Sequence, residues 1–65
     1  MNIIVNGQDV EVAESATVAD VVELLGFPDR GIAVAMDSTV LPRSRWDTAL
    51  SSGARIEVVM AVQGG

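Results

Sequence analysis

The chain has no cysteine, no histidine, no tyrosine and no lysine, and the absence of three of them excludes classes of chemistry. Without cysteine there are no disulfides, no thiolate nucleophile and no cysteine metal ligand. Without histidine the commonest general base and the other usual transition-metal ligand are missing. Without lysine the protein cannot form a Schiff base through its side chains. Because its carboxylates are scattered, we expect a carrier or binding module, not an enzyme, with no bound metal or cofactor.

Long apolar runs and an excess of positive charge are also missing. No run approaches the roughly 20 apolar residues of a membrane span, and the first residues lack the basic n-region of a signal peptide. We therefore expect a cytoplasmic protein with no membrane partner. Nine acidic residues against four arginines give a net charge of −5, which disfavours nucleic-acid binding. Sixty-five residues allow one small domain, 1–65.

The first half of the chain predicts a hairpin followed by a short helix. Residues 1–5 are rich in strand formers, and Asn6-Gly7 is the strongest short signal for a type I′ turn. Residues 8–12 then alternate polar and apolar, as a half-buried strand does. The expected helix begins at Thr17, with Asp20 completing a capping box, and it ends at Gly26 and Pro28. The residues expected on its buried face are Val18, Val21, Val22 and Leu25, and Leu24 widens that face.

The second half predicts three more strands. Residues 31–36 form an apolar run that we expect to be buried on both faces. Asp37-Ser38 turns the chain into a short strand, 39–41, which Pro42 confines to an edge. A connector, 43–50, tucks Trp46 and Leu50 under the core, and the final strand covers 55–62. The order ββαβββ, with the first and last strands parallel at the centre, predicts an α+β protein of the β-grasp (ubiquitin-like) class, a mixed sheet wrapped around one helix.

The last strand has two different faces. Because side chains alternate along a strand, one face carries Ile56, Val58, Met60 and Val62, and this larger set should face the helix. Val59 and Ala61 then lie on the open face. We expect Val59 and Ala61, together with Val62 just before the tail, to bind a partner protein.

Glycines follow the last strand. The sequence finishes with Gln63, Gly64 and Gly65, which we expect to form a flexible tail, 63–65. Glycine has no Cβ, so such a tail can enter a narrow channel and adopt backbone angles closed to other residues. We therefore expect the reactive group to be the α-carboxylate of Gly65 and not a side chain.

These features together resemble the ThiS family, the sulfur carrier proteins of thiamine biosynthesis. The resemblance covers essentially the whole chain. It is carried by the following segments: Ile4-Val5-Asn6-Gly7, Thr17-Val18-Ala19-Asp20-Val21-Val22, Gly31-Ile32-Ala33-Val34-Ala35, Val40-Leu41-Pro42-Arg43-Ser44-Arg45-Trp46, Arg55-Ile56-Glu57-Val58-Val59 and Val62-Gln63-Gly64-Gly65. Each segment is weak alone, and the combination is specific.

The resemblance implies a chemistry for the tail. An ATP-dependent activating enzyme would adenylate the carboxylate of Gly65. Sulfur from a cysteine desulfurase or another persulfide donor would displace AMP and leave a thiocarboxylate. Thiazole synthase would then take up the sulfur. ATP is used by the activating partner and is not bound by this chain.

Three other functions remain open at this point. The small subunit of molybdopterin synthase carries sulfur on the same fold and tail, although its members resemble this chain less. A ubiquitin-like modifier would be joined through Gly65 to lysines of target proteins. An interaction domain with an inert tail is the third, and for it the removal of Gly65 would change nothing.

Overall fold

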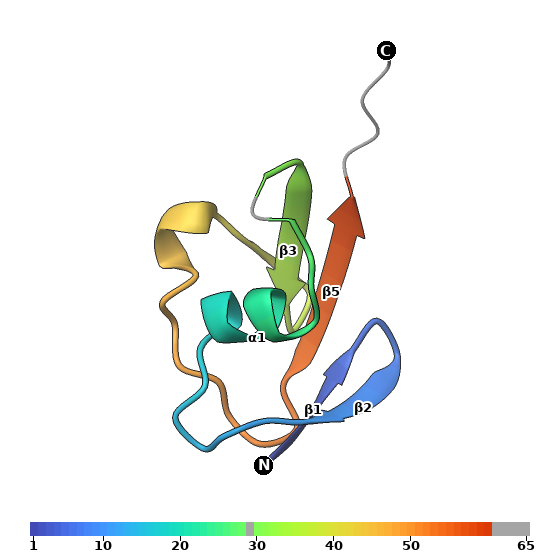
Figure 1. Ribbon diagram of the computed structural model, residues 1–65, viewed down its shortest axis with the longest axis vertical. Helices are drawn as coiled ribbons and strands as arrows, with labels where there is room; N and C mark the ends of the chain where they lie inside the picture. Colours follow the sequence, from blue (N-terminus) through green and yellow to red (C-terminus); the bar gives the residue numbers. More distant parts are fainter. Residues whose placement is uncertain (29, 61–65) are drawn as a thin grey trace.

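The computed structural model describes residues 1–28 and 30–60. It contains one mixed sheet whose strands lie in the order β2-β1-β5-β3-β4 (Figure 1). The strands are β1 (Asn2–Val5), β2 (Gln8–Glu11), β3 (Ile32–Met36), β4 (Thr39–Leu41) and β5 (Arg55–Met60). β1 and β5 are parallel and adjacent, and the other neighbours are antiparallel. The predicted β-grasp arrangement is confirmed.

The two tight turns follow from their sequences. Asn6 and Gly7 both have positive φ, 50° and 82°, as a type I′ hairpin turn requires. Asp37 and Ser38 have φ of 50° and 73° and join β3 to β4 in the same way. β4 lies at the edge of the sheet, and Pro42 directly follows its last residue, as predicted. The turns therefore fix the register of both hairpins.

Helix α1 (Val18–Leu24) begins with the predicted capping box. The Thr17 side-chain oxygen accepts from the Asp20 amide at 3.2 Å, and the Asp20 carboxylate accepts from the Thr17 amide at 2.9 Å. At the other end Gly26 has φ 77°, and the Phe27 amide donates to the carbonyl of Val22 at 3.0 Å. This is the Schellman pattern that stops a helix at a glycine.

The buried face of α1 is narrower than the sequence indicated. Val18, Val21 and Val22 are buried, but Leu24 is 62% exposed and Leu25 is 40% exposed. Leu25 is the C-cap, and its backbone is no longer helical, since its ψ is near 1°. The chain reverses direction at Gly26, and half-buried Phe27 packs against the core where Leu25 was expected. The expectation for Leu24 and Leu25 was therefore wrong.

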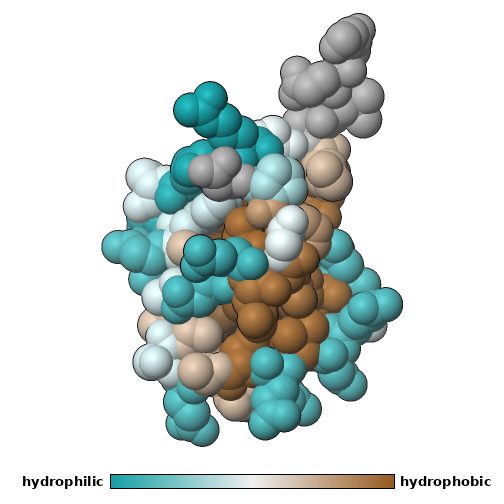
Figure 2. Space-filling view, viewed as in Figure 1, coloured by the Kyte–Doolittle hydropathy of each residue, from teal (hydrophilic) through white to brown (hydrophobic). Residues whose placement is uncertain are grey.

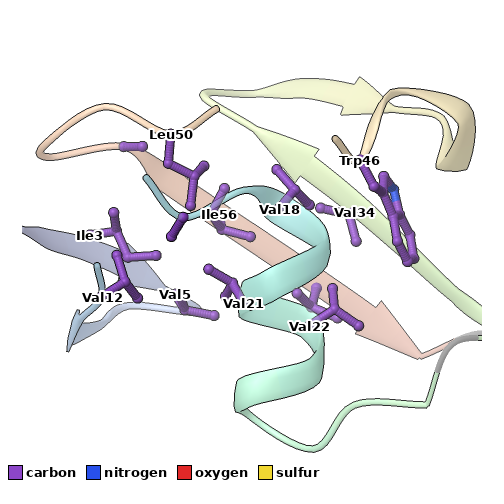
Figure 3. Packing of buried hydrophobic residues seen from close by; sticks show 13 residues of the cluster. Ile3, Val5, Val12, Val18, Val21, Val22, Val34, Trp46, Leu50 and Ile56 are labelled. Atoms are coloured by element: carbon purple, nitrogen blue, oxygen red, sulfur yellow. The ribbon is translucent and has the colours of Figure 1, made fainter. Parts of the chain in front are cut away.

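The core lies between α1 and one face of the sheet (Figure 3). Valine supplies more than half of its buried side chains, and Ile3 and Ile56 are fully enclosed. The connector contributes Trp46 and Leu50, as predicted, with a 3₁₀ turn η1 (Arg43–Arg45) just before the tryptophan. The Trp46 indole N–H donates to the carbonyl of Leu41 at 3.1 Å. The Arg43 guanidinium lies 5.6 Å from the indole centroid, a cation–π distance.

The sheet is covered by the helix on one face only. In β3 the side chain of Val34 is buried, whereas Ala33, on the opposite face, is exposed. The prediction that 31–36 is buried on both faces was therefore wrong. The open face of an antiparallel or mixed sheet can remain solvated, and small alanines expose little apolar area there.

Candidate functional site

The candidate site is the end of β5 from which the chain continues toward Gly65. β5 is the central strand, and its arrowhead projects past α1 (Figure 1). The tail residues Gln63, Gly64 and Gly65, and the two expected partner-binding residues Ala61 and Val62, lie outside the described residues. The described part of the strand ends at Met60, so the predicted extension to 62 is not described either.

Val59 lies where the sequence placed it. It is 62% exposed and lies on the face of the sheet away from α1. Ile56 and Val58 point to the other face and are buried. Its cross-strand partner on β3 is Ala33. An exposed β-branched residue opposite an alanine leaves its apolar surface accessible to another molecule.

Two neighbouring strands extend this apolar surface beyond what the sequence indicated. Ala35 is opposite Val40 of β4, and Val40 is 72% exposed. We call Val59, Ala33, Ala35 and Val40 the outer patch. The sequence contained a usable signal for it, because alanines alternate with larger residues in β3, and the smaller set belongs on the uncovered face.

The outer patch has an acidic border. Glu57 lies two residues before Val59, so it shares the outer face of β5, and it is exposed and opposite Ala35. Asp9 and Glu11 of β2 are exposed at the far edge of the sheet. Arg55, two residues before Glu57, is exposed on the same face and is opposite Ile4 of β1, so three carboxylates accompany one guanidinium there. A partner surface that covers the outer patch should therefore be apolar at its centre, with net positive charge toward the side of β1 and β2.

Met60 lies on the helix side of the sheet, as expected, but it is 58% exposed and is not part of the core. α1 has only seven residues and does not reach Met60, which is opposite half-buried Ile32 at the end of the sheet. Figure 2 shows hydrophobic residues on the helix side continuing to this end of the molecule. Both faces of the last strand thus expose an apolar side chain just before the tail.

The described residues hold no obvious catalytic apparatus. No group of three or more histidine, cysteine, aspartate or glutamate side chains in residues 1–28 and 30–60 could hold a metal ion. An open hollow of about 430 Å³ is lined by α1, Phe27, Arg43 and Trp46, with no contribution from β5. No helix among these residues is long and apolar enough to cross a membrane. Within the part of the chain that the structure describes, the end of β5 presents two exposed apolar side chains, Val59 and Met60.

Comparison with known proteins places this fold in a family. The family model that describes the ThiS family matches residues 3–65. A crystal structure of the thiamine biosynthesis protein ThiS from Geobacter metallireducens superposes with a TM-score of 0.81 at 29% identity, covering 100% of this chain and 99% of the other. A solution structure of a thiamine biosynthesis protein from the same organism gives 0.80 at 30% identity, covering 100% and 88%. A search of curated proteins found no match.

Proposed function

Because the chain belongs to the ThiS family, we propose that it carries sulfur for thiamine biosynthesis on the carboxyl group of Gly65. The observation that carries this proposal is the family match over residues 3–65, which includes the glycine pair. The absence of cysteine, histidine and lysine agrees with it, because a carrier needs no catalytic groups of its own if its partners supply them.

The proposed chemistry begins with activation of an unreactive carboxylate. A carboxylate oxygen of Gly65 attacks the α-phosphorus of ATP in the activating enzyme, and pyrophosphate leaves. The acyl-adenylate is electrophilic because AMP is a good leaving group. A persulfide from a cysteine desulfurase route attacks the carbonyl carbon and expels AMP, and a second thiol then cleaves the sulfur–sulfur bond. The products are the thiocarboxylate of Gly65 and a disulfide.

The thiocarboxylate then serves as the sulfur donor for thiazole synthase. In this proposal the sulfur enters the thiazole ring, and the carrier returns with its carboxylate. Glycines at 64 and 65 suit both partners, because a chain without Cβ atoms can pass through a channel that branched residues would block. We propose that Gly64 is the narrow part of this tail and that Gln63 connects it to the domain.

The decisive experiment is intact-protein mass spectrometry. The purified chain is incubated with ATP, a thiazole-pathway activating enzyme, a cysteine desulfurase and cysteine. We expect a gain equal to the replacement of one oxygen by sulfur, and loss of that gain after thiazole synthase and its substrates are added. No gain with an enzyme that loads its own carrier would contradict the proposal. Loading without transfer to thiazole synthase would favour a molybdopterin carrier, and conjugates to lysines would favour a modifier.

The outer patch gives a second prediction. We propose that Val59, with Ala61 and Val62 beyond it, docks on the activating enzyme. Val59→Asp should then raise the Kd for that enzyme by about tenfold or more, because an interface core cannot easily desolvate a carboxylate. The fold should persist, since Val59 is 62% exposed. Isothermal titration with the enzyme measures the Kd.

Leu24→Asp is a matched control for this titration. Leu24 is also 62% exposed but lies on α1, on the opposite side of the sheet. The substitution adds the same charge and removes a similar apolar surface, so its Kd should equal that of the parent chain. Equal weakening by both substitutions would show that net charge, and not the outer patch, determines affinity.

A further inference from the structure

Two side-chain oxygens hold the central strand β5, one near each end. Asn6 Oδ1 accepts from the amide of Val58 at 2.8 Å, and Asp37 Oδ1 accepts from the amide of Arg55 at 3.0 Å. Asn6 and Asp37 occupy the same position, the first residue of a two-residue turn, and both have φ of 50°. The two hairpin turns of this fold therefore also bind the strand that leads to the tail.

The bond from Asn6 replaces one that the backbone of β1 does not provide. The parallel ladder between β1 and β5 ends at Val5 and Ile56, and the Asn6 amide donates to the carbonyl of Ile56 at 2.9 Å. The chain then turns at Gly7 toward β2, so β1 offers no further carbonyl to β5. The Asn6 side chain supplies the oxygen that the Val58 amide needs.

This double role restricts the residue at position 6. A positive φ favours glycine, asparagine and aspartate. Of these, only asparagine and aspartate also carry an acceptor oxygen on the carbon after Cβ. The Asn-Gly pair predicted the turn from the sequence alone, but the bond to a residue 52 positions away becomes visible only in the structure.

We propose that Asn6 is a positioning residue for loading of the tail. Val58 immediately precedes Val59, and six residues lie between it and Gly65. By holding the Val58 amide, Asn6 keeps the end of β5 in register, so that the outer patch and the tail are offered together to the activating enzyme. Without this bond the enzyme must order the end of β5 as it binds, and that ordering weakens association. This role rests on the proposed function.

The test compares Asn6→Gly with Asn6→Asp. Glycine keeps the positive φ but lacks the acceptor, whereas aspartate keeps both. With the activating enzyme, we expect Asn6→Gly to raise KM for the carrier in ATP–pyrophosphate exchange by about three- to tenfold, the range of one lost hydrogen bond. The kcat should not change, because the carboxylate and its chemistry are untouched. Asn6→Asp should restore the parent KM, and amide exchange at Val58 should be faster in Asn6→Gly alone.

Asp37→Gly is the control for a general loss of stability. It removes the equivalent bond, to Arg55, at the end of β5 remote from the tail, and glycine again suits the turn. We expect its KM to equal that of the parent chain. Equal increases in KM for Asp37→Gly and Asn6→Gly, or no increase for Asn6→Gly while the parent chain is loaded, would overturn the role of Asn6. A parent chain that an active enzyme does not modify would overturn the proposed function and this role with it.

Discussion

Removal of Gly65 should lower the rate of adenylation by about two orders of magnitude or more, although the shortened chain still ends in a glycine carboxylate. The reacting group is chemically the same, but it is withdrawn by one residue, about 3.3–3.6 Å of extended chain. A misplacement of 1 Å can already cost a factor of about a hundred in rate. The enzyme must therefore find the carboxylate at a fixed distance from the docked domain.

The measurement is ATP–pyrophosphate exchange with saturating activating enzyme, followed by intact mass of the carrier. A matched variant carries one extra glycine after Gly65, which keeps the carboxylate and moves it outward by the same distance. Both variants should lose activity. Their thermal unfolding should match the parent chain, because Val58 is the last buried core residue among residues 1–28 and 30–60. Near-parent rates in both would refute a fixed reach and favour a loosely held tail.

Gly65→Ala tests a different property of the same residue. Alanine keeps the reach and the carboxylate but adds a Cβ beside the reacting carbon. A channel that excludes side chains should reject it, so the rate should fall even though the distance is right. If Gly65→Ala is loaded as fast as the parent chain while the shortened chain is not, the enzyme is selective for the length of the tail and accepts a methyl side chain at its last residue.

Local chemistry in this sequence predicted local structure well. The turn at Asn6-Gly7, the capping box of Thr17 and Asp20, and the stop at Gly26 each depend on residues within four positions of one another, and all three were confirmed. The order of these elements predicted the β-grasp arrangement, and β1 and β5 do lie parallel at the centre of the sheet. The position of Val59 on the open face followed from the alternation of side chains.

Two of the errors, at Leu25 and Met60, concern where the helix stops covering the sheet, and the error at 31–36 concerns the face that no helix covers. Periodicity assigned Leu25 and Met60 to buried faces, yet both are exposed. The apolar periodicity of one segment does not indicate how far the segment that packs against it will extend. Val58 belongs to the buried cluster that includes the valines of α1, whereas Met60 does not, and Phe27 packs against that cluster while Leu25 does not. The hydrogen bond between Asn6 and Val58 was missed for a related reason, since the sequence around either residue does not indicate that the other lies nearby.

Ile56→Ala should destabilise the domain by about 2–5 kcal/mol, the usual cost of emptying a large buried site. Ile56 is 0% exposed, on the central strand, and is opposite Val5 on one side and Met36 on the other. At about 0.05–0.15 kcal/mol per residue, 65 residues have a total stability of about 3–10 kcal/mol. The substitution should therefore remove a large fraction of that stability. Urea unfolding followed by Trp46 fluorescence measures it.

Two variants on the same strand set the scale for this measurement. Ile56→Val removes one methylene and should cost about 0.5–1.5 kcal/mol. Val59→Ala removes exposed surface and should cost less than about 1 kcal/mol. The core is rich in valines, whose stiff side chains cannot easily move into a void. If Ile56→Ala costs no more than Ile56→Val, the core collapses around the vacancy and its packing is looser than the structure indicates.

The loss of stability in Ile56→Ala should be partly reversible by the activating enzyme, which distinguishes it from a defect of the tail. An enzyme that binds only the folded carrier stabilises it by about 2.7 kcal/mol when present at a hundred times Kd. Loading of Ile56→Ala should therefore rise with enzyme concentration toward the parent yield, because its Gly65 carboxylate is intact. Loading of the chain without Gly65 should stay low at every concentration. If excess enzyme does not rescue Ile56→Ala, the packing of β5 contributes to the docking geometry itself and not only to the folded population.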